Sequence, residues 1–237
     1  MRADMERGRD ASLRPTVIRA VVFGAIASII GIVVALAINW FPPAASTQAG
    51  KIDTLWDVLL ICSIPIFVLV TTVVVVSVIK FRMRPGEEEL DGPPIHGNTR
   101  LEVIWTAIPA TLLIALCAYA YIVLHDIEKA PAAQELNVKV TGQQFTWTFE
   151  YRGTNGKNFT VPQLYVPEGQ SVHFNIVSKD VLHDFWVPAF RMKIDAVPGI
   201  DTHLRVTTNN KLGEYAVVCA ELCGLGHSTM RQSAYVL

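Results

Sequence analysis

Three long stretches without any charged residue constrain this chain more than any other feature of its sequence. They cover residues 20–40, 58–79 and 103–124 and contain no Asp, Glu, Lys or Arg. A helix rises about 1.5 Å per residue, so about 20 apolar residues cross a hydrocarbon core about 30 Å thick. We therefore predict three membrane helices, the first over residues 20–40 and the others extending slightly beyond their stretches, to 55–80 and 101–125.

The first stretch also allows a second interpretation, as a secretory leader. Signal peptides have an apolar region of about 7–15 residues that is followed by a small-residue cleavage site. The stretch here is longer, and Thr47-Gln48-Ala49 is only a weak cleavage site. A retained helix and a cleaved leader both stay open, and both leave the C-terminal part of the chain on the same side.

The basic residues predict the orientation of these helices. Residues 1–19 contain five arginines, and Lys80 with three further arginines lies between the second and third stretches, whereas residues 41–57 contain only Lys51. Basic residues favour the cytoplasmic side, so residues 1–19 and the loop 81–100 are predicted to be cytoplasmic. We expect a multi-pass protein, in a bacterial plasma membrane, whose C-terminal domain lies on the outer side. The net charge of −1 gives no indication of nucleic-acid binding.

The C-terminal part has the pattern of a β-sheet domain. After a linker at 126–132, residues 133–237 have ordinary polarity, and apolar and polar residues alternate at 138–141, 172–176 and 204–207. Clusters of Gly, Pro and Asn separate these stretches. Short alternating strands with such turns are typical of an antiparallel sandwich or barrel.

The chemistry of the domain is concentrated in one segment, residues 219–230, which contains Cys219, Cys223, His227 and Met230. A disulfide would leave the histidine and the methionine unexplained, and zinc gains nothing from a thioether. Copper binds thiolate, imidazole and thioether groups together. A single blue-copper ion uses one cysteine, so the second thiolate favours two bridged copper ions.

A second histidine must come from elsewhere in the chain. His173 and His203 alternate with apolar neighbours and are interpreted as solvent-facing, whereas His183 lies in a bend rich in apolar residues. A histidine in such surroundings needs a metal or a firm hydrogen bond, so we choose His183. Cys62 and Cys117 lie in apolar stretches, where cysteine behaves as a small apolar residue.

From about residue 53 to its C-terminus the sequence resembles subunit II of the haem–copper cytochrome c oxidases. The resemblance rests on C-x-E-x-C-x-x-x-H-x-x-M at 219–230 and on three shorter matches, at 100–106, 180–183 and 193–199. It implies a cupredoxin-like Greek-key sandwich, preceded by a membrane helical hairpin; the first helix is an addition to that pattern.

The resemblance also implies a ligand set for a dinuclear copper centre of the CuA type. Cys219 and Cys223 would bridge two copper ions, His183 and His227 would each bind one, and Met230 would be a weak ligand. The backbone carbonyl of Glu221 would complete the set. The Glu221 carboxylate would help bind a magnesium ion shared with subunit I.

Two further positions are interpreted through the family. Glu102 follows Thr99 in a capping-box pattern, and in the family it would also lie at the mouth of a proton channel. Where the family usually has Trp-Tyr-Trp, this chain has Phe145, Thr146 and Trp147. In the family the first tryptophan of this group usually receives electrons from cytochrome c, so Phe145, which takes its place, is a candidate for that role. Trp147 is equally well explained as an electron relay or as part of the sandwich core.

The sequence thus predicts an oxidase subunit II that accepts electrons from a c-type cytochrome and passes them to the haem groups of subunit I, where oxygen is reduced to water and protons are translocated. Its partners would be subunit I, other oxidase subunits, the donor cytochrome and membrane lipid. The chain has no C-x-x-C-H motif, so the donor haem belongs to another protein. Three alternatives remain open: a stand-alone membrane carrier with a CuA centre, a structural oxidase subunit without copper, and the copper domain of a nitrous oxide reductase, which lacks such a hairpin.

Overall fold

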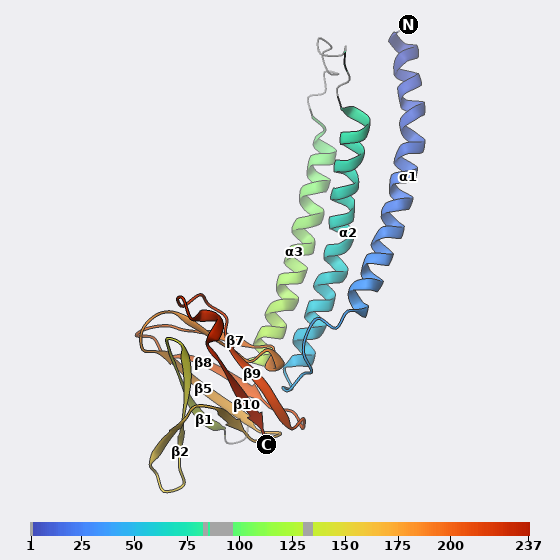
Figure 1. Ribbon diagram of the computed structural model, residues 1–237. Coiled ribbons are helices and arrows are strands. Elements are labelled where there is room, and N and C mark those ends of the chain that lie inside the picture. Colours follow the sequence, from blue (N-terminus) through green and yellow to red (C-terminus); the bar gives the residue numbers. More distant parts are fainter. Residues whose placement is uncertain (1, 83–84, 86–96, 130–134) are drawn as a thin grey trace. The chain divides into compact units, whose positions relative to one another are not determined.

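The computed structural model contains three long helices followed by a β-sheet domain (Figure 1). It describes residues 2–82, 85, 97–129 and 135–237, with side chains from Arg14 onward. Most of the predicted loop 81–100, the end of the linker 126–132 and the first two residues of the predicted domain lie outside the described residues. The helices are α1 (Arg2–Ala37), α2 (Ala49–Phe81) and α3 (Thr99–Ile127).

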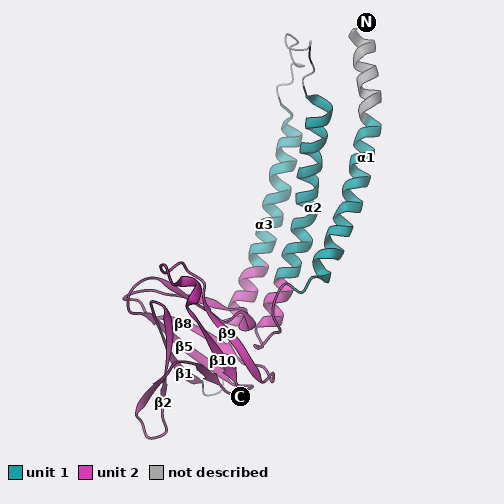
Figure 2. Cartoon of the chain, in the orientation of Figure 1, with its two compact units in different colours: residues 1–39, 56–118 teal, residues 40–55, 119–237 magenta. Residues whose placement is uncertain are grey.

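The chain divides into two compact units (Figure 2). The first comprises residues 1–39 and 56–118, and the second comprises residues 40–55 and 119–237. The segment that joins α1 to α2 therefore belongs to the β-sheet unit, together with the first turns of α2 and the last turns of α3.

All three helices are long and apolar enough to cross a membrane. α2 and α3 contain the second and third uncharged stretches, whereas α1 ends at Ala37, three residues before the end of the first. The large apolar side chains of the helices are mostly exposed, as expected for surfaces that face lipid. Within the first unit, small residues allow α1 and α2 to approach closely. A Cβ added at Gly31 would lie only 2.9 Å from Ile64 Cγ2, so this approach requires a glycine, and small residues are typical of such contacts between membrane helices.

The N-terminus of α3 differs by one residue from the predicted capping box. The sequence pattern indicated Thr99 as the capping residue, but the backbone N–H of Leu101 donates to Asn98 Oδ1 at 3.2 Å. The Glu102 carboxylate accepts the backbone N–H of Asn98, also at 3.2 Å. The cap is Asn98 because its side chain is the one placed to accept a free N–H of the first turn.

Ten strands form the second unit. In chain order they are β1 (Leu136–Gln143), β2 (Thr146–Arg152), β3 (Asn158–Val161), β4 (Leu164–Val166), β5 (Ser171–Ser178), β6 (His183–Trp186), β7 (Lys193–Ala196), β8 (Thr202–Thr207), β9 (Gly213–Cys219) and β10 (Arg231–Val236). Two short 3₁₀ helices, Pro188–Phe190 and His227–Thr229, interrupt the loops.

The strands make two five-stranded sheets, in the orders β3-β2-β1-β5-β8 and β4-β10-β9-β6-β7. This confirms a membrane helical segment followed by a cupredoxin-like sandwich. The expected antiparallel pairing holds for the other strand pairs, but β1 pairs with β5 in parallel and β4 pairs with β10 in parallel. Parallel neighbours need a long crossover connection, and both pairs join strands that are distant in the sequence.

The core lies between the two sheets and is rich in aromatic residues. Trp147, Phe149, Phe174 and Phe185 are at most 1% exposed, and Phe185 makes ring contacts with the other three. Each fully buried side chain of this kind contributes about 1.5–3 kcal/mol. Because Phe185 follows His183 on β6 by two residues, this packing also fixes the strand that carries the predicted histidine ligand.

Candidate metal centre

The pairing of two strands brings together predicted ligands that are 36 residues apart. β6 begins at His183, β9 ends at Cys219, and the two strands are antiparallel neighbours in which Phe185 pairs with Cys219. The backbone N–H of Ala220 donates to the carbonyl of Asp184 at 3.0 Å, which continues this contact past the end of β9. The sheet therefore places the imidazole beside the first cysteine.

The remaining predicted ligands come from the loop between β9 and β10, residues 220–230, which is called the metal loop below. The backbone N–H of Cys219 donates to the carbonyl of Met230 at 3.2 Å and closes the base of this loop. Between these residues the chain turns through Gly224, whose φ is +134°, and the 3₁₀ helix at His227. A side chain at Gly224 would disfavour this φ, so the glycine allows the loop to return over Cys223.

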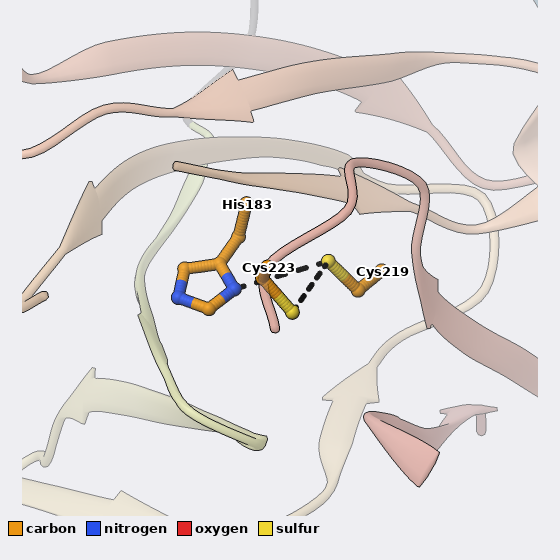
Figure 3. Close-up of side chains that lie close together, drawn as sticks. All are labelled: His183, Cys219 and Cys223. Atoms are coloured by element: carbon orange, nitrogen blue, oxygen red, sulfur yellow. Dashed lines mark hydrogen bonds between the residues drawn. The ribbon is translucent and has the colours of Figure 1, made fainter. Parts of the chain in front are cut away.

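Five donor side chains converge where this loop meets β6 and β9. Figure 3 shows dashed lines from Cys219 to the His183 ring and to Cys223; Cys219 Sγ lies 3.8 Å from His183 Nδ1 and 3.9 Å from Cys223 Sγ. Cys223 Sγ in turn lies 3.6 Å from His227 Nδ1 and 3.9 Å from Met230 Sδ. The backbone oxygen of Glu221 lies 3.2 Å from Cys219 Sγ. Every predicted copper ligand is therefore in this cluster.

The centre is largely shielded from water. His183 and Met230 are completely buried, Cys223 is 4% exposed and Cys219 is 8% exposed. His227 is half-buried and lies on the more open side. The two sulfur atoms belong to free cysteines and are too far apart for a disulfide, which requires about 2.05 Å.

Asp180 fixes the orientation of the buried histidine. Its Oδ1 lies 2.8 Å from His183 Nε2, and its Oδ2 accepts the backbone N–H of Gln144 at 2.8 Å. Burial alone would raise the pKa of Asp180, but these hydrogen bonds lower it below its ordinary value. An ionised carboxylate only accepts, so Nε2 carries the proton and Nδ1 turns a lone pair toward the sulfur atoms. Metal-binding histidines usually have such a partner.

The protonation of the cysteines provides a test of whether a metal fits here. Burial, together with the adjacent Cys219, raises the pKa of Cys223 to about 11. A second thiolate is thus disfavoured at neutral pH unless positive charge arrives between the sulfurs. A bound cation supplies that charge and deprotonates coordinating thiols. The donor set also fits copper, because zinc has no use for a thioether sulfur.

The two predicted aromatic residues occupy different places. Trp147 is fully buried and meets the His183 ring edge-on, with ring centroids 5.8 Å apart. Its Nε1 has no hydrogen-bond partner in the described part of the chain. Phe145 is half-buried against the metal loop, where a Cβ added at Gly226 would lie 2.4 Å from Phe145 Cδ2.

The two predicted carboxylates also differ in position. Glu221 lies in the metal loop and is half-exposed, while Glu102 is exposed in the first turn of α3 and belongs to the first unit. His173 and His203 are outside the centre: their rings stack on each other with centroids 5.2 Å apart. His203 is exposed and His173 is half-buried.

Three residues beside the centre were not predicted: Asp180, Gln144 and Asp184. Asp184 is 1% exposed, and one of its carboxylate oxygens pairs with Lys193 while Oδ1 has no partner in the described part of the chain. Burial raises the pKa of Asp184 despite this ion pair. The sequence carries no signal for the contacts of Gln144, because its partners lie 36 and 79 residues further along the chain, whereas Asp180 lies only three residues before His183, within the match at 180–183.

Comparison with protein families matches most of the chain. Residues 33–123 match the model described as cytochrome c oxidase subunit II, transmembrane domain, and residues 159–234 match the model of the periplasmic domain of the same subunit. The first match covers the end of α1, all of α2 and most of α3, and the second covers the sandwich from β3 to β10 with the loop that carries Cys223.

Individual relatives agree with this result. The chain is 32% identical to a cytochrome c oxidase subunit 2 of Thermostichus vulcanus, over 87% of this chain and 79% of the relative. It is 39% identical to that of Alkalihalophilus pseudofirmus, over 72% of this chain and 52% of the relative. Among solved structures, the periplasmic domain of subunit II of the Bradyrhizobium japonicum cytochrome oxidase is 28% identical, covering 46% of this chain and 88% of that chain with a TM-score of 0.42.

Proposed function

Since the chain belongs to the cytochrome c oxidase subunit II family, we propose that it is the subunit through which electrons reach a terminal respiratory oxidase. In this proposal a CuA centre in the outer domain accepts single electrons from a c-type cytochrome. They pass on to the haem groups of subunit I, where oxygen is reduced to water and protons are translocated.

The observation that carries this proposal is the convergence of two thiols, two imidazoles and a thioether in one buried cluster. With the Glu221 carbonyl, six donors are present. One tetrahedral zinc ion would use only four of these donors. One blue-copper ion would use only one of the two cysteines. Two copper ions would use the whole set.

The chain's own residues hold and insulate the metal pair. Cys219 and Cys223 would supply both thiolates, with His183 and His227 at the two ends. Met230 and the Glu221 carbonyl would be the weaker ligands. When bound, the copper pair supplies a one-electron redox centre whose charge is shared between two ions. Burial of His183, Met230 and both cysteines keeps water from the ligand positions and favours electron transfer over reactions that need an open coordination site.

Phe145 and Trp147 are the proposed aromatic contacts for arriving electrons. Phe145 is packed on the metal loop and remains partly accessible, which supports a role next to the donor protein. Trp147 touches the His183 ring from inside the sandwich. Its complete burial equally supports a core role, so Phe145 is the stronger candidate for donor contact.

Two carboxylates have proposed roles beyond electron transfer. The exposed Glu102 at the start of α3 would take up protons on the cytoplasmic side, and its carboxylate is only loosely held, by a 3.2 Å hydrogen bond. Glu221 would direct its carbonyl to the metal pair and its half-exposed carboxylate to a magnesium ion shared with subunit I. Magnesium prefers such oxygen ligands.

The test of the central proposal is the metal stoichiometry of the full chain. Purified in detergent and loaded with copper, the native chain should hold two copper ions and give a seven-line mixed-valence EPR signal. Cys223→Ser should abolish this signal, since it removes a shared thiolate. The matched control is Cys117→Ser, which changes a cysteine of α3 outside the cluster and should leave the signal intact. One copper ion with a blue-copper spectrum, or no copper with a Cys219–Cys223 disulfide, would refute the proposal.

A further inference from the structure

The tip of the β1–β2 hairpin contacts both loops that carry the predicted ligands. Gln144 lies at this tip, between β1 and β2. Its side-chain Nε2 donates to the backbone carbonyl of Cys223 at 2.6 Å. Its backbone N–H donates to Asp180 Oδ2 at 2.8 Å, and Asp180 Oδ1 is bonded to the His183 ring. One residue thus links the histidine side of the centre to the cysteine loop.

The loop is shaped to accept this contact. A Cβ added at Gly224 would lie 2.8 Å from Gln144 Nε2 and 3.2 Å from Phe145 Cζ. A Cβ at Gly226 would meet the Phe145 ring at 2.4 Å. The two glycines therefore leave room for the Gln144 amide and the Phe145 ring. The amide reaches the Cys223 carbonyl because the next residue, Gly224, has no side chain to block it.

From these contacts we propose that Gln144 is a positioning residue of the metal centre. Its side-chain amide holds the backbone of Cys223, and so sets where the second sulfur lies relative to Cys219. Its backbone N–H holds the carboxylate that orients His183. This proposal rests on the proposed copper site, and it assigns to the hairpin tip a part in building that site as well as in contacting a donor protein.

The two bonds of Gln144 come from different groups, so they can be separated by substitution. Gln144→Met removes the amide donor but keeps the backbone N–H and the length of the side chain. The Cys223 half of the centre should change while the Asp180–His183 bond remains. Gln144→Asn keeps an amide but is one methylene too short to preserve the 2.6 Å contact, and provides a second variant with little change in polarity.

The experiment uses the full chain in detergent, loaded with copper ions. Loss of an outer hydrogen bond at a metal site typically costs about 10–100-fold in metal affinity, so copper release to a chelator should be at least about tenfold faster in Gln144→Met and Gln144→Asn. In paramagnetic NMR spectra the Cys223 β-proton resonances should move, whereas the His183 ring resonances should stay. The matched control is Gln143→Met, at the preceding exposed residue, which should resemble the native chain.

The outcomes distinguish this inference from the function on which it rests. If the native chain takes up no copper, the proposed function fails. If the native chain holds copper and both Gln144 variants release it at the rate of Gln143→Met with unchanged Cys223 resonances, the positioning role alone is overturned. Equal displacement of the Cys223 and His183 resonances would also overturn it, because a general loosening of the fold would then explain the effect.

Discussion

At the scale of single residues, the centre depends on small side chains as much as on its ligands. Gly142, Gly224 and Gly226 each lie where a Cβ would press on a neighbouring ring or amide. Gly142 leaves room for His183 and Trp147, each of which would lie 3.0 Å from an added Cβ. The arrangement of the ligands therefore depends on having glycine at these three positions.

Gly226→Ala should destabilise the domain through the Phe145 ring. The added Cβ would lie 2.4 Å from Cδ2, and overpacking of this kind costs about 1–3 kcal/mol. Denaturant unfolding of the full chain measures the loss. Gly50→Ala, in α2 with nothing within 4 Å of the new Cβ, should have a small effect. If the clash is the cause, Phe145→Ala should lower the free energy of unfolding less in the Gly226→Ala variant than in the native chain. Losses of stability that simply add in the double variant would contradict this explanation.

His173 should make the domain less stable in acid. Burial, with Arg205 nearby, lowers the pKa of His173 below 6.5. As pH falls through 6.5, His173 takes up a proton in the unfolded chain before it does so in the folded domain. Its contribution to the free energy of unfolding is therefore fully present above pH 6.5 and is lost as the pH falls toward the lower folded pKa. His173→Gln should therefore reduce the fall in melting temperature between pH 8 and pH 5. His125→Gln, at an exposed histidine near the end of α3, is the control. An unchanged slope in His173→Gln would count against this assignment.

At the scale of elements, the segment joining α1 to α2 is built into the sandwich unit. Ala45 is fully buried, and its backbone N–H donates to the carbonyl of Ala189 at 2.8 Å. The Arg191 side chain is 5% exposed and donates to both carboxylate oxygens of Asp53, at 2.7 and 3.2 Å, and to the Pro42 carbonyl. Arg191 directly follows the 3₁₀ helix after β6, so this ion pair attaches the segment close to the strand that carries His183.

Asp53→Asn should loosen this attachment. The buried guanidinium would lose a charged bidentate partner, and leaving such a group poorly paired costs about 1–3 kcal/mol. We expect a lower melting temperature and faster protease cleavage within residues 40–48. Asp57→Asn makes the same change of charge one turn further along α2 and is the control. Equal cleavage rates in the two variants would show that the Arg191 pair does not hold the segment.

At the scale of the whole molecule, the distribution of charge and the number of apolar helices predict on which side each end lies. Three helices that are long and apolar enough to cross a membrane separate the N-terminal arginines from the C-terminal domain, and we predict that all three cross it. An odd number of crossings places these two parts on opposite sides, and the basic residues assign the cytoplasm to the first.

This topology predicts different accessibility for two introduced cysteines. In sealed vesicles with the outer side exposed, a membrane-impermeant maleimide should label Asn155→Cys, at the exposed turn before β3, without permeabilisation. Ser12→Cys should be labelled only after the vesicles are opened. The native chain gives the background from its four cysteines. Labelling of both variants in sealed vesicles would exclude an odd number of crossings.

The sequence by itself determined the features that depend on local chemistry. An uncharged stretch of membrane length has few alternatives to a helix, because buried backbone groups must bond within the segment. The alternation around Val138, Phe174 and Leu204 predicted strands whose apolar faces are indeed buried in β1, β5 and β8. Four of the donors could be grouped in advance because they lie within twelve residues of one another in the sequence.

Only the tertiary structure decided how distant segments meet. The choice of His183 rested on its apolar surroundings, but its contact with Cys219 arises from the pairing of β6 with β9. The parallel pairing of β1 with β5 and the contacts of Gln144 with Asp180 and Cys223 join segments that are 36 to 79 residues apart. Such contacts depend on how complete sheets pack, and periodicity within a single segment contains no information about them.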